Sequence, residues 1–385
     1  MTRIESWAHR ITACAALVLT SCAALPERLE GTNYTAESAP FVAASVEALT
    51  PEAALPQRQG LVHRVLLIGD AGVPRESEPV LETLRVWGDA HPNDTTVLYL
   101  GDNVYPSGLE KDDRPHGERV LRAQLEASDA HKIFVPGNHD WGFPYQGSDR
   151  VLRQQAYVEA NGAEFLPRDG CPGPAYRELV PTDDDGRRGV ALILIDIDPW
   201  FAEEAERPSC PGAETPQELA EQLATLLERH REQWLIVGAH HPLRTGGPHG
   251  GFTRGWLADF VTGTIFLIYG SLQDAYEEGY RAIMLPIEEA LASAPPLVYA
   301  AGHDHNLQIL EGNGHARFQI VSGAGATDRV RGGSVTDIEG TLFAHGHPGF
   351  MALDIVRTPS GERALLYVVE TGKPDPVLQL DLGAR

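Results

Sequence analysis

Short apolar runs recur along the chain, and several of them end in a cluster of polar residues. Five such runs end in GDAG (69–72), GDNVY (101–105), GNHD (137–140), AHHP (239–242) and GHDH (302–305). Continuous apolar runs of this length are typical of parallel strands that are buried on both faces. Ligands bind at the carboxyl ends of such strands in open α/β sheets, so we expect the five polar ends to meet in one crevice.

Between these runs the apolar positions change to a helical spacing. Val80, Leu84 and Trp87 follow one another at i, i+4 and i+7, which predicts the buried face of a helix. The segment TPQE (215–218) is a capping box with proline at the first helical position, and it predicts a helix start. Leucines at 219, 223, 226 and 227 continue that helix on one face. Strands that alternate with amphipathic helices over residues 61–385 predict an α/β domain.

The N-terminus has the pattern of an export signal. Basic residues precede an apolar stretch over 11–20 that is too short to remain as a spanning helix, so residues 1–21 are predicted to be a signal peptide. The segment LTSC (19–22) resembles the lipobox of bacterial lipoproteins, which implies cleavage before Cys22 and a lipid on that residue. An ordinary signal with a chance cysteine is the alternative. Residues 22–60, rich in Ala, Pro, Glu, Ser and Thr, are predicted to be a flexible tether.

Export also sets the expected location and the state of the cysteines. The protein is expected in the bacterial cell envelope, held to a membrane by the lipid alone, or in the periplasm or outside the cell. Once Cys14 is removed with the signal and Cys22 is lipidated, Cys171 and Cys210 remain, each followed by Pro-Gly. An oxidising compartment favours a disulfide between them, and two free thiols are the alternative.

The charge balance excludes some partners. The chain of 385 residues has 54 acidic and 31 basic residues, which gives a formal net charge of −23. Such a surface repels nucleic acid at long range. It does not repel a small phosphate ester from a metal site, where bound cations dominate the local field. The oligomeric state is left open, with a monomer favoured.

The polar strand ends together offer carboxylate, phenol, amide and imidazole groups: Asp70, Asp102, Tyr105, Asn138, His240, His303 and His305. This mixed set is large enough for two metal ions, and it favours transition metals over calcium. Asp102 is the natural bridge, because one carboxylate can give an oxygen to each ion. Taken singly, the Asp and Asn residues are equally typical of turns after strands.

These motifs also carry a family resemblance. GDAG, GDNVY, GNHD, HHP and GHDH resemble, in order and type, the five motifs of calcineurin-like metallophosphoesterases. The tyrosine of GDNVY is the mark of purple acid phosphatases, and GHDHNLQ (302–308) followed by VSGAG (321–325) is similar to their small, mammalian tartrate-resistant branch. The resemblance covers about residues 61–355 and implies a four-layer α/β/β/α sandwich. Two motifs depart from the family pattern, AHHP in place of GHxP and alanine in GDAG, but neither departure removes a ligand.

The resemblance assigns each donor to a metal ion. It implies a first ion, Fe(III), bound by Asp70, Asp102, Tyr105 and His305. It implies a second, divalent ion (Fe, Zn or Mn) bound by Asp102, Asn138, His240 and His303. His240 is preferred to His241 as the ligand, and His241 is expected to contact the substrate. The resemblance also places His249, nine residues after His240, beside the substrate.

The implied reaction is hydrolysis of phosphate monoesters by water that the two ions activate. His139, oriented by Asp140, or else His249, would protonate the leaving oxygen. A phosphodiesterase or a nucleotide pyrophosphohydrolase is the alternative on the same fold, because an insertion at 243–290 would shape the pocket. A surface-binding protein without catalysis is a third interpretation. The apolar run at 260–269 is too short to span a membrane and is expected to be core or a wall of that insertion.

Overall fold

The computed structural model describes residues 29, 31–47, 57–73, 77–142, 147–183, 187–202, 207–252, 273–275, 277–327, 333–373 and 375–383. The predicted signal peptide, Cys22 and the apolar run at 260–269 lie outside the described residues. Within the described ranges, no helix is both long enough and apolar enough to cross a membrane.

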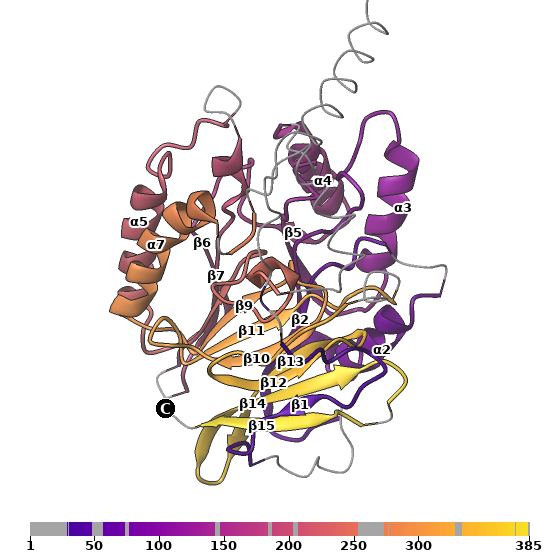
Figure 1. Cartoon of the computed structure of the whole chain (residues 1–385), viewed down its shortest axis with the longest axis vertical. Helices are drawn as coiled ribbons and strands as arrows, with labels where there is room; N and C mark the ends of the chain where they lie inside the picture. The colour runs from indigo at the N-terminus through magenta and orange to yellow at the C-terminus, as the bar shows by residue number, and fades with distance from the viewer. Residues whose placement is uncertain are drawn as a thin grey trace, which may run out of the picture.

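Two sheets form the centre of the molecule (Figure 1). The seven-stranded sheet has the order β15-β14-β13-β2-β3-β4-β5, and the eight-stranded sheet has the order β1-β12-β10-β11-β9-β8-β7-β6. The strands of the first sheet are β2 (Leu61–Ile68), β3 (Thr95–Leu100), β4 (His131–Val135), β5 (Glu164–Phe165), β13 (Gly349–Thr358), β14 (Gly361–Glu370) and β15 (Leu378–Gly383). The strands of the second are β1 (Phe41–Val42), β6 (Ala175–Val180), β7 (Val190–Leu194), β8 (Trp234–Gly238), β9 (Val298–Ala301), β10 (Leu307–Glu311), β11 (Phe318–Ser322) and β12 (Thr341–His345).

Helices cover the outer faces of both sheets (Figure 1). The seven-stranded sheet is covered by α2 (Pro79–Gly88), α3 (Arg114–Leu125) and α4 (Asp149–Ala160), and the eight-stranded sheet by α5 (Pro216–Arg229) and α7 (Glu278–Ser293). Short 3₁₀ turns lie at η1 (Pro92–Asp94), η2 (Asp198–Phe201) and η4 (Pro248–Gly250). The predicted four-layer α/β/β/α sandwich is confirmed.

The sandwich follows from strands that are apolar on both faces. In β3, Leu98 and Leu100 point into the core between the two sheets. Val97 and Tyr99, on the opposite face of the same strand, pack in the core under α2, α3 and α4. Because side chains alternate along a strand, one continuous apolar run supplies two cores.

The predicted helix signals agree with the structure. Val80, Leu84 and Trp87 are buried on α2. At the start of α5, the hydroxyl of Thr215 accepts a hydrogen bond from Glu218 N at 3.2 Å. The Glu218 carboxylate accepts from Glu214 N at 2.8 Å, one residue before the expected partner. The Thr215 hydroxyl therefore satisfies an amide that the helix leaves without a partner, and the Glu218 carboxylate holds the chain just before the cap.

Residues 31–47 belong to the predicted tether, yet they lie against the eight-stranded sheet. Phe41 and Val42 form β1, which pairs antiparallel with β12. His345 Nε2 lies 3.0 Å from the carbonyl oxygen of Ser38, and Gly346 N donates to Tyr34 O at 3.0 Å. This stretch extends the folded sheet beyond the boundary expected at residue 61.

Candidate metal centre

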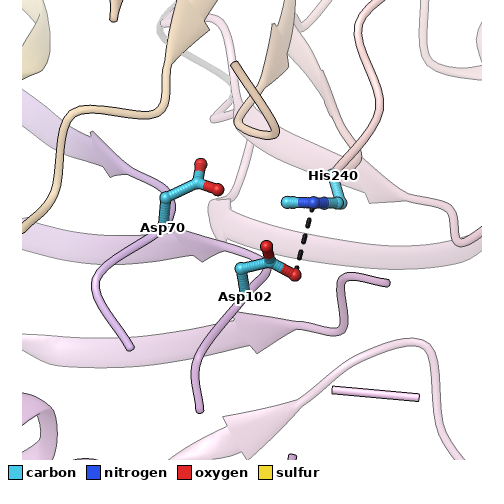
Figure 2. A group of neighbouring side chains, drawn as sticks. All are labelled: Asp70, Asp102 and His240. Atoms are coloured by element: carbon cyan, nitrogen blue, oxygen red, sulfur yellow. Dashed lines mark ion pairs between the residues drawn. The ribbon is translucent and has the colours of Figure 1, made fainter. Parts of the chain in front are cut away.

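The five motifs follow strands from both sheets. β2, β3 and β4 are parallel neighbours in one sheet, and β8 and β9 are parallel neighbours in the other. The carboxyl ends of parallel neighbours share one edge of their sheet. Asp70 and Asp102 therefore approach His240 across the boundary between the two sheets (Figure 2). The strand ends that were expected to meet therefore belong to two sheets rather than to one.

Glycine in these motifs lets the strand ends approach one another. A Cβ atom on Gly137 would lie 2.5 Å from Asp102 N and 2.8 Å from Cγ of His240. A Cβ on Gly302 would lie 2.7 Å from Oδ2 of Asp70. Side-chain atoms do not tolerate such distances, so Gly137 and Gly302 set how closely the donors of neighbouring motifs can lie.

Three of the predicted ligands have left-handed backbone conformations. The φ angles are 60° at Asp70, 53° at Asp102 and 71° at His303. Such a conformation costs roughly 1–2 kcal/mol for an ordinary residue, and Asp tolerates it better than His. Strained residues concentrate at functional sites, and here they turn the chain sharply as each strand ends.

The first donor cluster joins a carboxylate, a phenol and an imidazole. The hydroxyl of Tyr105 donates to Oδ1 of Asp70 at 2.8 Å and lies 3.2 Å from Nε2 of His305. Nε2 of His305 is 3.4 Å from the same Asp70 oxygen. These are the residues, apart from Asp102, that the sequence assigned to the first metal ion.

The second cluster brings three hydrogen-bond acceptors together. Nδ1 of His240 lies 2.8 Å from Leu100 O and donates to it, which leaves a lone pair on Nε2. Nε2 of His303 likewise donates to the carbonyl oxygen of Gln273 at 3.2 Å, which leaves a lone pair on Nδ1. Nε2 of His240 and Nδ1 of His303 are 3.2 Å apart, and they lie 3.0 and 3.2 Å from Oδ1 of Asn138. With His240 neutral, three lone pairs face one another and repel unless a proton or a metal cation lies among them, so this donor set fits a bound metal ion.

Asp102 connects the two clusters. Its Oδ1 is 3.4 Å from Nε2 of His240, the contact drawn in Figure 2, and it accepts from His139 N at 2.9 Å. Donor atoms of Asp70, Asp102 and His240 all lie within 4.8 Å of one another. The three side chains are fully or almost fully buried.

The electrostatics of the two carboxylates also favour cations. Burial raises the pKa of Asp70 to about 7, against the charge of His240. Burial opposes ionisation of Asp102 too, but the charges of His240 and His139 hold the pKa of that carboxyl below its usual value. Two carboxylates buried together resist double ionisation, and a cation between them removes that resistance.

A family model described as calcineurin-like phosphoesterase matches residues 63–307, which is more than half of the chain. The chain belongs to the calcineurin-like phosphoesterases. Human tartrate-resistant acid phosphatase type 5 is 23% identical over 239 residues, and the match spans 60% of this chain and 60% of that protein. Purple acid phosphatase 4 of Arabidopsis thaliana is 22% identical over 308 residues, and the match spans 76% of this chain and 77% of that protein.

One similar solved structure is described as GAP50, the anchor in the inner membrane complex of Plasmodium. It has a TM-score of 0.56 and 16% identity, and the match covers 84% of this chain and 89% of that chain. At this identity the likeness shows the fold alone.

His139 lies at the edge of the two clusters of this calcineurin-like phosphoesterase. Its ring packs against Tyr105 with 4.4 Å between centroids, and its side chain is 22% exposed. Nδ1 lies 2.5 Å from the carbonyl oxygen of Pro106, and Nε2 lies 4.0 Å from Oδ2 of Asp102. The ring therefore presents Nε2 toward the clusters.

Asp140 was expected to orient His139, but the structure gives that contact to Pro106. The Asp140 carboxylate accepts instead from the amides of Asn103, Val104 and Gly137, at 2.9–3.0 Å. It also accepts from the side-chain amide of Asn103 at 2.9 Å. Asp140 thus ties the GNHD loop to the GDNVY loop, and its effect on His139 is indirect.

His241 was expected to contact substrate, but its side chain is buried. Its ring centroid is 4.6 Å from that of His303, and Nδ1 lies 3.9 Å from Oδ2 of Asp198. Burial lowers the pKa of His241 well below the ordinary value. In this conformation His241 supports the metal ligands from behind and offers a substrate no exposed surface.

His249 was expected beside the substrate, and in the structure it lies against the predicted ligand His303. Its ring packs on His303 with 3.9 Å between centroids. Two aspartates that the sequence analysis did not select hold it: Asp304 accepts from His249 N at 3.2 Å, and Asp274 contacts its ring. Asp304 stands inside the GHDH motif, which was a usable signal, whereas nothing around Asp274 in the sequence marks it.

Proposed function

We propose that this protein uses two metal ions to hydrolyse small phosphate monoesters, as an acid phosphatase does. The supporting observation is the pair of donor clusters joined through Asp102. The cluster with Asp70, Tyr105 and His305 contains a phenol and a carboxylate, which suit Fe(III). The cluster with two imidazoles and an amide suits a divalent Fe, Zn or Mn ion. The two relatives described as acid phosphatases favour the same reaction.

Two ions held by these residues would lower the pKa of a bound water and neutralise charge on a phosphoryl group. One of two histidines of the chain, His139 or His249, would supply the proton for the leaving oxygen. Since Nδ1 of His139 is held by Pro106 O, Nε2 is the nitrogen that can carry this proton. The part-exposed ring admits a ligand on that side. Proton donation of this kind contributes about 10²–10⁴-fold to a rate.

The test compares two tyrosine variants of the purified protein. Tyr105→Phe removes the phenol of the first cluster. Tyr99→Phe is the matched control, because Tyr99 is also buried and its hydroxyl donates to Gln124 O at 2.8 Å, away from the clusters. We expect about two metal ions per chain and a visible charge-transfer band in the unchanged protein, loss of the band in Tyr105→Phe, and its retention in Tyr99→Phe.

Substrate assays then separate the alternatives. A monoester such as p-nitrophenyl phosphate is expected to be cleaved faster than bis-p-nitrophenyl phosphate or a nucleoside diphosphate ester. The reverse preference would support the phosphodiesterase or pyrophosphohydrolase interpretation. A protein that binds no iron, zinc or manganese after reconstitution, and cleaves none of these esters, would support a binding protein instead.

We also propose an envelope location, because the N-terminal pattern indicates export and a lipid on Cys22. A labelled fatty acid is expected to be incorporated by the full chain but not by Cys22→Ser. Incorporation by both proteins would contradict this proposal. No nucleic acid partner is expected, because the net charge is −23.

A further inference from the structure

Residues 273–275 make three contacts with His303 and His249 of the candidate metal centre. The carbonyl oxygen of Gln273 lies 3.2 Å from Nε2 of His303. Oδ1 of Asp274 lies 2.7 Å from Nδ1 of His249. Ala275 N donates to the carbonyl oxygen of His249 at 2.8 Å. One short segment therefore contacts both a predicted metal ligand and the histidine that packs on it.

We propose that Asp274 is a positioning residue that holds His249 as a proton donor to the leaving oxygen. This proposal rests on the proposed phosphatase function. The carboxylate accepts from Nδ1, so Nε2 is the ring nitrogen through which His249 donates to a substrate oxygen.

Burial gives Asp274 and His249 different roles. Asp274 is almost fully buried, whereas the His249 side chain is 23% exposed. The buried carboxylate is thus a fixed support, and the histidine is the member of the pair that a substrate can reach. Charge-assisted hydrogen bonds between such partners are stronger than neutral ones, and they fix the orientation of the imidazole ring.

The backbone of His249 is held from the opposite side by Asp304. Its Oδ1 accepts from His249 N at 3.2 Å, and its Oδ2 accepts from the Thr245 hydroxyl. A Cβ on Gly247 would lie 2.4 Å from the Asp304 carboxyl carbon, so the loop that contains Gly247 and His249 packs directly against Asp304. Asp304 thus holds the backbone of His249, and Asp274 contacts its ring.

The kinetic test uses esters whose leaving groups differ. Proton donation matters for a poor leaving group, such as the alkoxide of glycerol phosphate, and hardly matters for p-nitrophenolate. Asp274→Ala is expected to lower kcat on glycerol phosphate about 10²-fold or more, and on p-nitrophenyl phosphate only a few-fold. Asp274→Asn retains an acceptor for Nδ1 without the charge and is expected to fall between Asp274→Ala and the unchanged protein. Glu278→Gln, which changes an exposed acid at the start of α7, is expected to change neither rate.

Equal losses on the two esters in Asp274→Ala, with metal content unchanged, would overturn the proposal, because a general structural defect acts on both. An unchanged rate on glycerol phosphate would overturn it as well. The Asn variant keeps the test decisive if the Ala variant does not fold.

A spectroscopic readout separates this proposal from the proposed function. Long-range ¹H–¹⁵N spectra of the metal-free protein, with His249 assigned from His249→Gln, are expected to show a proton on Nδ1. In Asp274→Ala the same signal is expected to move toward a mixture of tautomers. A protein without phosphatase activity that shows this shift would contradict the phosphatase function and leave the pair intact. An unchanged spectrum would overturn the proposal that Asp274 positions His249.

Discussion

Replacing Gly137 by alanine tests whether close approach of the motif loops sets the metal centre. The new Cβ would lie 2.5 Å from Asp102 N, 2.6 Å from Oδ1 of Asp102 and 2.8 Å from Cγ of His240. Ordinary contacts of this kind begin at 3.4 Å, so at least one loop must move by roughly 0.9 Å. The atoms in the way belong to the backbone and the carboxylate of Asp102 and to the ring of His240, which is buried and held by Leu100 O.

Overpacking of this kind costs about 1–3 kcal/mol of unfolding free energy. A displacement of that size also misplaces the donors, which is expected to weaken metal binding about 10–100-fold and to lower the rate about 10²-fold. Unfolding in urea, followed by tryptophan fluorescence, gives the first quantity, and metal titration gives the second. Gly279→Ala is the control, because nothing lies within 4 Å of its Cβ and alanine favours the helix by about 0.5–1 kcal/mol. A Gly137→Ala protein as stable and as tightly metal-binding as the unchanged chain would refute the reasoning.

Three further predictions concern stability. The disulfide between Cys171 and Cys210 joins residues 39 apart, so its removal in the double serine variant is expected to lower the unfolding free energy by about 4 kcal/mol. Burial lowers the pKa of His63 to about 4, so the folded state resists a proton that the unfolded state takes up below about pH 6.5. Stability is therefore lost as pH falls from about 6.5 to 4, and His63→Gln is expected to lose less over that range in urea titrations. Removal of residues 1–56 is expected to cost about 2–4 kcal/mol relative to removal of 1–28, because each lost hydrogen bond of the β1 segment contributes about 1 kcal/mol. Equal denaturation midpoints for the two truncated proteins would show that the segment adds no stability.

The sequence predicted the layers because each strand carries its own signal. In β3 and its neighbours the apolar runs are continuous, which is the pattern of strands with a core on both faces. The donors could be predicted for a related reason. Each donor follows a strand within its own motif, and parallel strands bring their ends to one edge without further information. What the pattern did not contain was the division of the motifs between two sheets.

The N-terminal boundary was harder to predict. Phe41 and Val42 form a strand of two residues. A strand so short shows no alternation of apolar and polar residues from which it could be predicted. The composition around it is typical of a linker. Only the partner strand β12, some 300 residues further along the chain, makes this stretch part of a sheet.

Contacts between elements explain the remaining differences. The sequence placed Asp140 beside His139 because the two are adjacent, but in the structure the carboxylate turns toward amides of the preceding motif loop. The opposite holds for Asp274, which is 25 residues from His249 in the chain and 2.7 Å from it in space. The predicted ligands directly follow their strands, so a short sequence motif contains each of them. The residues that orient the histidines are brought close by the packing of elements that can be distant in the sequence. For this fold, sequence motifs are sufficient to predict which donor atoms meet at the strand ends, and a structure is needed to find which groups hold the neighbouring histidines.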